Sequence, residues 1–209
     1  MDGITPREVR SRLKLSDRQQ AVLAGTILGD GCVAKHGRHH RLHIKHKEAH
    51  RALAEWKHGV FREFISMKPH VFDQCLNGRR YPCVQFATRT HPEFTEWHSR
   101  FYQGRRKIVP LNIASYLSPL AVAVWFMDDG AADYAGITFQ THSFSVEEVR
   151  LLADVLRTEF HLTVGLRANR GANILYVPSR SIQRFRGIVE PHLVSGFEYK
   201  LVPRRLRTP

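Results

Sequence analysis

The sequence predicts an α+β fold in which one αββαββα unit occurs twice. Two apolar stretches rich in small residues end in the same dipeptide, at Asp30-Gly31 and at Asp129-Gly130. Each is followed by the alternating pattern of a β-hairpin and then by an amphipathic helical pattern. Because this order recurs in the second half, we expect two pseudo-symmetric repeats, each a four-stranded antiparallel sheet backed by helices.

The first repeat is expected over residues 18–103, after an N-terminal extension over residues 1–17. Its second hairpin contains Asn77-Gly78, the strongest short-range signal for a two-residue turn between strands. In order, the motif helix, two strands, an amphipathic helix, two strands and a closing helix are expected at residues 23–30, 32–35, 41–46, 49–64, 71–76, 81–88 and 92–101.

The second repeat is expected over residues 119–202, with a linker over residues 104–118 before it and a basic tail over residues 203–209 after it. Ser145 followed by Glu148 has the pattern of a capping box, which marks the start of a helix. The same elements in the same order are expected at residues 122–129, 131–134, 137–142, 149–160, 162–167, 174–177 and 181–189.

The net charge points to a polyanionic partner. The 209 residues carry a formal charge of +13, and the isoelectric point is near 10.2. Arginine is more common than lysine, and a planar guanidinium suits phosphates and guanine edges better than an ammonium group does. We therefore expect a nucleic acid partner. A protein of the membrane surface would carry one basic amphipathic helix instead, and none stands out.

Cysteine usage indicates a reducing compartment. Three cysteines without a Cys-x-x-Cys spacing argue against a disulfide framework and against a structural zinc site. The sequence also shows no signal-peptide pattern and no apolar stretch long enough to span a membrane. We expect a soluble intracellular protein with no membrane partner. Many arginines with few lysines and asparagines favour a bacterial or archaeal cytoplasm over an AT-rich organelle.

The two Asp-Gly ends are the strongest candidates for a functional site. A carboxylate at the C-terminal end of a helix is disfavoured by roughly 0.3 to 1 kcal/mol. Small residues such as Gly25 and Ala121 would let the two helices pack closely and bring Asp30 and Asp129 together. Two neighbouring carboxylates repel each other and therefore call for a divalent cation.

The alternative interpretation is structural. Two buried core helices could each end in an exposed Asp-Gly turn without binding anything. In either case, Gly31 and Gly130 are expected in the left-handed conformation that ends a helix.

One face of each sheet is expected to be polar. With Leu42 and Ile44 packed inward, the alternation turns neighbouring polar residues outward, where they could contact base edges. Arginines at strand ends and turns could contact phosphates. The alternative is a sheet face that is only solvated. The expected DNA contacts are Arg38, Arg41, His43, Lys45, Arg79, Arg80, Gln85, Thr138, Gln140, Arg167 and Arg170.

These features together resemble the LAGLIDADG homing endonucleases of the single-chain type with two motifs. The resemblance covers roughly residues 18 to 202, and the first motif departs from the family pattern at Thr26 and Leu28. The segments that carry it are Leu23-Ala24-Gly25, Gly29-Asp30-Gly31, Lys107-Ile108-Val109-Pro110, Trp125-Phe126-Met127-Asp128-Asp129-Gly130, Ser143 to Val149, Tyr176-Val177-Pro178, Val189-Glu190-Pro191 and Tyr199-Lys200-Leu201.

The resemblance implies a monomer that cleaves double-stranded DNA. Its two motif helices would pair so that the sheets form a DNA-binding saddle over a long asymmetric target. Asp30 and Asp129 would ligate Mg²⁺ or Mn²⁺, with the main-chain carbonyls of Gly29 and Asp128 as further oxygen ligands. One aspartate in each repeat would allow one cut on each strand and so a staggered double-strand break.

Two pairs of residues are candidates to complete the active site. Arg89 and Arg180 end the last strand of each repeat, and each lies five residues before an aromatic residue. His46 and His142 lie near the end of the second strand, but the alternation turns His46 inward and His142 outward. The alternative role for all four is plain contact with DNA.

Two other functions remain open. An RNA maturase that assists splicing of an intron would also use a basic sheet face, and its partner would be intron RNA. A DNA-binding regulator that does not cleave is disfavoured by the two motif aspartates, because acids near phosphates weaken binding.

Overall fold

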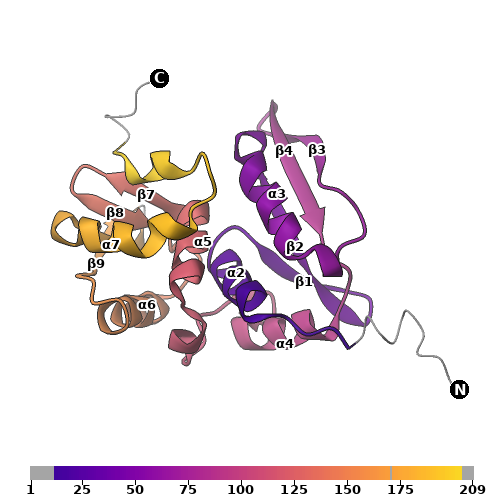
Figure 1. The fold of residues 1–209 in the computed structure, drawn as a ribbon, viewed down its shortest axis with the longest axis horizontal. Helices are drawn as coiled ribbons and strands as arrows, with labels where there is room; N and C mark the ends of the chain where they lie inside the picture. Colours follow the sequence, from indigo (N-terminus) through magenta and orange to yellow (C-terminus); the bar gives the residue numbers. More distant parts are fainter. Residues whose placement is uncertain (1–11, 170, 204–209) are drawn as a thin grey trace, which may run out of the picture. The chain divides into compact units, whose positions relative to one another are not determined.

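A computed structural model describes residues 12–169 and 171–203, which fall into two compact units (Figure 1). Unit 1 contains the described residues up to Gln20 together with Gly31–Arg100. Unit 2 contains Ala21–Asp30 together with the described residues from Phe101 onward. Each unit has one four-stranded antiparallel sheet.

The sheet of unit 1 has the strand order β1-β2-β4-β3. Helix α3 packs against β2 and β4 and lies across this sheet in Figure 1. The helices and strands, in chain order, are α2 (Asp17–Leu28), β1 (Cys32–His36), β2 (His39–Lys47), α3 (Arg51–Val60), β3 (His70–Leu76), β4 (Arg79–Ala87) and α4 (Pro92–Phe101).

The expected register of unit 1 is confirmed by burial and by turn geometry. Leu42, Ile44 and Val84 are buried on the face that α3 covers. At the β3–β4 turn, Asn77 and Gly78 have φ values of 50° and 74°, which are the positive values of a type I′ hairpin.

The sheet of unit 2 has the matching order β7-β8-β10-β9. Helix α6 packs against β9 and β10, while α7 packs against α5. Ser145 and Glu148 form the expected capping box at the start of α6. The main elements are α5 (Pro119–Asp129), β7 (Gly130–Asp133), β8 (Gly136–Phe139), α6 (Val146–Thr158), β9 (Gly165–Asn169), β10 (Ala172–Pro178) and α7 (Ile182–Val189).

The segment between the repeats is structured. Strands β5 (Tyr102–Gln103) and β6 (Arg106–Lys107) form a short hairpin. Glu148 holds the segment that follows, because its carboxylate accepts hydrogen bonds from Arg106 at 2.9 Å and from the Val109 N–H at 3.3 Å.

The predicted α+β class and the double αββαββα order are confirmed, although several elements differ in extent. For example, α3 ends at Val60 instead of near residue 64, and β9 begins at Gly165 instead of residue 162. Strand β8 ends at Phe139, not near residue 142, because Thr141 donates its hydroxyl to the Asn173 carbonyl at 2.8 Å and the chain turns. The compact units do not follow the expected repeat boundaries, since Ala21–Asp30 belongs to unit 2. Those boundaries stay a prediction. In the described ranges, no helix is both long enough and apolar enough to cross a membrane.

Candidate metal centre and nucleic-acid interface

Glycines allow α2 and α5 to pack closely inside unit 2. A Cβ atom on Gly25 would lie 2.3 Å from the Ala121 carbonyl oxygen and 2.8 Å from the Val124 Cβ, both too short for real atoms. Only glycine fits there without moving a helix backbone. The predicted close packing of the two motif helices is therefore confirmed.

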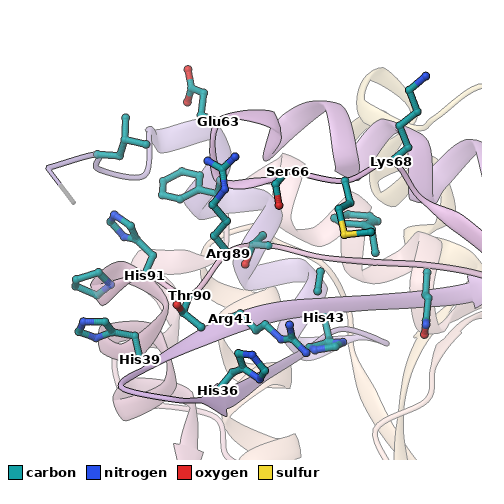
Figure 2. Close-up of a pocket in the computed structure, with 18 of the residues that line it drawn as sticks. His36, His39, Arg41, His43, Glu63, Ser66, Lys68, Arg89, Thr90 and His91 are labelled. Carbon is teal, nitrogen blue, oxygen red and sulfur yellow. The ribbon is translucent and has the colours of Figure 1, made fainter. Parts of the chain in front are cut away.

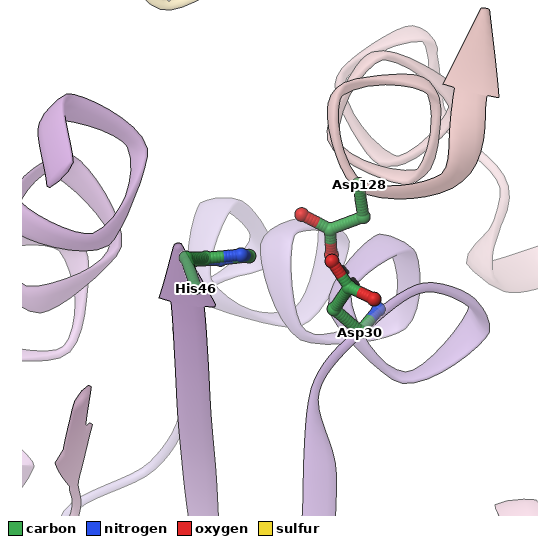
Figure 3. A group of neighbouring side chains, drawn as sticks. All are labelled: Asp30, His46 and Asp128. Carbon is green, nitrogen blue, oxygen red and sulfur yellow. Dashed lines mark hydrogen bonds between the residues drawn. The ribbon is translucent and has the colours of Figure 1, made fainter. Parts of the chain in front are cut away.

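A second glycine, Gly29, leaves the space that brings two carboxylates together at the ends of these helices. A Cβ on Gly29 would lie 2.5 Å from the Asp128 Cβ, so the side chain of Asp128 occupies the space that glycine leaves. The Asp30 N–H donates to Asp128 Oδ2 at 3.3 Å. One carboxylate oxygen of each residue lies within 4.8 Å of the other. Figure 3 shows the two side chains next to each other. Asp128 is buried, whereas Asp30 is exposed.

The second motif aspartate has an unusual acidity. Asp129 is the last residue of α5 and is half-buried. Burial, followed by the charges of Asp30 and Asp128, raises the pKa of the Asp129 carboxyl to about 7, although Lys107 and Lys200 oppose the rise. Three carboxylates therefore share one electrostatic environment, and their negative charge is only partly compensated by the protein.

A lysine lies on the carbonyl end of each motif helix. Lys107 donates to the Gly29 carbonyl at 2.7 Å, and Lys200 donates to the Asp128 carbonyl at 3.0 Å and to the Met127 carbonyl at 2.5 Å. The last carbonyls of a helix have no partner within the helix and carry its negative dipole end, so a cation there stabilises it.

The sequence alone did not indicate a role for these two lysines. The only indication of one was that both lie in segments that carry the family resemblance, Lys107-Ile108-Val109-Pro110 and Tyr199-Lys200-Leu201. They contact the two carbonyls that were predicted as metal ligands. A carbonyl oxygen has two lone pairs, so a lysine contact leaves one for another partner.

The expected left-handed glycines at the motif ends are wrong. Gly130 has φ −86° and ψ 156° and begins strand β7 directly, and Gly31 is not among the residues with positive φ. Gly130 is needed for space instead. A Cβ there would lie 2.0 Å from Cδ2 of Phe126.

The residues at the helix ends fit a divalent cation. Carboxylates and main-chain carbonyls are hard oxygen donors of the kind that Mg²⁺ and Mn²⁺ prefer. After burial, the negative charges of Asp30 and Asp128 also raise the pKa of Asp129, and a cation would offset that repulsion.

Of two further candidate residues in unit 2, Gln140 lies beside the Asp129 end of α5 and Arg180 does not. The Gln140 N–H donates to the Asp129 carbonyl at 3.0 Å, so Gln140 lies beside the motif end. Arg180 follows Pro178, which pairs with Gly136 at the far end of the β7–β8 hairpin, and its Nε donates to Thr163. The structure therefore does not bring Arg180 to Asp129.

The other candidates are placed as follows. His142 lies in the exposed turn between β8 and α6. His46 is 4% exposed on the covered face of the unit 1 sheet, as the alternation predicts, and its Nε2 is 3.5 Å from the Lys57 Nζ. Arg89 is exposed just beyond β4. Catalytic roles for His46, His142 and Arg89 stay predictions.

Unit 1 has a polar open face. The strand register puts Arg41, His43, Lys45 and Gln85 on the sheet face opposite the buried Leu42 and Ile44, and we call this the unit 1 open face. It forms part of a groove of about 1020 Å³, which Figure 2 shows with Arg41, His43 and Arg89. Burial, followed by the charges of Arg41 and His36, lowers the pKa of His43.

The turn arginines of unit 1 border this face. Arg38 lies exposed in the β1–β2 turn, and Arg79 and Arg80 lie exposed at the start of β4. Arg80 is 4.0 Å from the Asp73 carboxylate.

The corresponding face of unit 2 differs from expectation. Thr138, Tyr176 and Arg167 share it, and we call it the unit 2 open face. Thr138 is only 8% exposed and donates to the Ala131 carbonyl at 3.3 Å, because Tyr176 lies directly opposite on β10. Thr138 therefore lies on the outward face, as the alternation predicts, but its side chain is covered there. Arg170 lies outside the described residues.

The family model described as the LAGLIDADG DNA endonuclease family matches residues 20–185. The chain belongs to this family. This LAGLIDADG chain is 27% identical over 197 residues to probable intron-encoded endonuclease 1 of Wickerhamomyces canadensis, covering 90% of this chain and 85% of that protein. The structure of the homing endonuclease I-WcaI bound to its DNA recognition sequence matches with a TM-score of 0.88 at 26% identity, covering 97% of this chain and 96% of that one.

A splicing protein is also similar. The chain is 30% identical over 127 residues to the cytochrome b mRNA maturase bI2 of Debaryomyces hansenii, which covers 60% of this chain and 48% of the maturase. The LAGLIDADG chain thus spans about half the length of that relative. The predicted family, with its single-chain layout of two motifs, is confirmed.

Proposed function

We propose that this LAGLIDADG protein is a site-specific homing endonuclease that makes a staggered double-strand break in a long asymmetric DNA target. The observation that carries the proposal is the cluster of Asp30, Asp128 and Asp129 at the ends of the paired motif helices. A DNA-bound relative at 26% identity over nearly the whole chain supports DNA as the partner. We further propose that the protein acts as a monomer with repeats at 18–103 and 119–202.

Asp30 and Asp129 would hold Mg²⁺ or Mn²⁺, with the carbonyls of Gly29 and Asp128 available as further ligands. Bound ions would supply an activated water and neutralise charge on the scissile phosphate and the leaving oxygen. The Asp128 carboxylate accepts the Asp30 N–H, so it fixes the backbone of the first ligand and raises the local negative charge.

Lys107 and Lys200 would position the centre. Each holds the carbonyl end of one motif helix, and their charges partly offset the carboxylates that an approaching phosphate would meet. Gln140, bonded to the Asp129 backbone, lies close enough to the motif end to orient a water or a phosphate. The bacterial or archaeal host stays a prediction.

The first test is a cleavage selection. The purified protein with Mg²⁺ is incubated with a genomic or randomised duplex library, and the cut ends are sequenced. We expect one long asymmetric site with staggered ends, and no cutting in EDTA.

Single variants then test the metal centre. Asp30→Asn and Asp129→Asn should each lower double-strand cleavage at least a hundredfold while duplex binding is kept, because each removes a proposed metal ligand. Asp154→Asn is the matched control, since that carboxylate is exposed on α6 and paired with Arg157. Full cleavage by either motif variant would overturn the proposed function.

The second candidate function is an intron RNA maturase, which is favoured by the similarity to a cytochrome b mRNA maturase over 127 residues. Binding of the host intron RNA with faster splicing, in a protein that cuts no duplex, would favour this function over cleavage.

A further inference from the structure

The two open faces differ in charge. Among the strand residues of the unit 1 open face are four cationic side chains and no carboxylate, namely Arg41, Lys45, Lys47 and Arg79. Four histidines share this face. Within the described ranges, none of those four cations forms an ion pair with a carboxylate. They are therefore available to a polyanion without first breaking an internal contact.

The polar side chains of the unit 2 open face already interact with one another and with the backbone. Among its described strand residues, Arg167 is the one cation and Asp133 is the one anion. The guanidinium carbon of Arg167 lies 3.2 Å from the ring centroid of Tyr176, and its Nη1 donates to Asp133 at 3.5 Å. Tyr176 also donates its hydroxyl to the Ala135 carbonyl at 2.5 Å. Contact with DNA would have to replace some of these interactions.

Several arginines on the helices are also neutralised. Arg51, Arg100, Arg157 and Arg186 each pair with a carboxylate three or four positions away. Among the strand residues that the structure describes, the cations without an ion pair are concentrated in unit 1, where they can act together on a backbone of phosphates.

We propose that the unit 1 open face supplies most of the duplex affinity and base discrimination, and that the half of the target read by unit 2 is recognised loosely. This inference rests on the proposed DNA cleavage. Two energetic costs on the unit 2 open face support it. Arg167 is already stacked and ion-paired, so it gains little free energy from contact with a phosphate. The buried Thr138 hydroxyl donates to a backbone carbonyl, so it cannot reach a base edge without breaking that hydrogen bond.

The first experiment measures binding to a 30-bp duplex of random sequence in EDTA, over a series of salt concentrations. Arg41→Ala should weaken binding roughly five- to tenfold and reduce the slope of log affinity against log salt by about 1. Arg167→Ala is the matched control, since it removes the same charge from the other open face. We expect it to change affinity less than twofold. An equal or larger loss with Arg167→Ala overturns the inference.

Two further variants complete the test. One shows whether a change in affinity comes from altered folding, and the other is expected to bind DNA more tightly. Arg167→Lys keeps the charge with a different shape, and its thermal unfolding shows whether any change comes from lost packing. Asp133→Asn removes the carboxylate that holds Arg167 and should tighten duplex binding two- to fivefold. Weaker binding by a folded Asp133→Asn variant would contradict the inference.

The second experiment scans the selected target one base pair at a time. Positions whose penalty disappears in Arg41→Ala define the half read by unit 1. Substitutions there should lower cleavage roughly 5- to 100-fold, which is the usual range for a read base pair, against less than threefold in the other half. Equal penalties in the two halves, in a protein that still cuts, overturn this inference alone. A protein that neither binds nor cuts any duplex overturns the proposed function together with it.

Discussion

The two motif ends have the same Asp-Gly sequence but differ in surroundings. In the first, Gly29 precedes an exposed Asp30. In the second, Asp128 precedes a half-buried Asp129 with a pKa of about 7. Gly29 leaves the space that the Asp128 side chain fills, and the Asp128 charge then adds to the burial that raises the pKa of Asp129. A duplicated motif therefore does not produce a symmetric site, since one helix supplies the space and the other supplies the extra carboxylate.

The largest expected effect comes from removing that space. Gly29→Ala would place a Cβ against Asp128 and should lower the free energy of unfolding by about 1 to 3 kcal/mol. Asp128→Gly introduced into that variant should recover part of the loss, because the space then lies on the other helix. Urea unfolding measures both.

The matched control is Gly59→Ala in α3, where a Cβ would meet nothing within 4 Å. It should leave stability unchanged or raise it by about 0.5 to 1 kcal/mol through helix propensity. A Gly29→Ala variant that behaves like Gly59→Ala would show that the two motif ends do not compete for space.

The next largest expected effect is a pH dependence of the unfolding free energy that comes from Asp129 at the second motif end. Because the folded pKa of Asp129 is raised from 3.8 to about 7, its contribution to stability is fully present below pH 4 and is lost as the pH rises through about 7. Asp129→Asn removes this loss, so the difference in unfolding free energy between variant and wild type should grow by on the order of 2 kcal/mol from pH 5 to pH 8.

This comparison is made in EDTA, by chemical denaturation at each pH. Asp154→Asn should follow the wild type throughout, since that residue is exposed. Addition of Mg²⁺ at pH 8 should stabilise the wild type more than Asp129→Asn. A difference that is flat with pH would contradict the unusual acidity of the second motif end.

The smallest expected effect compares the two lysines. Lys200 is buried and contacts the Asp128, Met127 and Phe126 carbonyls, whereas Lys107 donates to the Gly29 carbonyl and is only half-buried. Lys200→Met should therefore cost about 2 kcal/mol of stability and Lys107→Met about 1 kcal/mol, because more buried carbonyls lose a donor. Thermal unfolding of the two variants side by side measures the difference. An equal or reversed order would contradict the asymmetry of the two ends.

Sequence reasoning found the elements that depend on local patterns. The Asn77-Gly78 turn, the Ser145–Glu148 capping box and the alternation that buries His46 are confirmed. Each is encoded within a few residues, and the repetition of the whole pattern indicated the double αββαββα order. The same local patterns placed Thr138 on the outward face but did not indicate its burial there, because that burial depends on Tyr176 from a distant strand.

The sequence by itself therefore determined the family, the order of the elements and the two aspartates at the motif ends. Only the tertiary structure decided what surrounds them. The Asp128 side chain fills the space beside Gly29 and accepts a hydrogen bond from Asp30, which is 98 positions away. Lys107 and Lys200 donate to carbonyls at the two helix ends that are 78 and 72 positions away. Short-range preferences say nothing about such contacts, because they exist only once packed helices have placed one backbone against another.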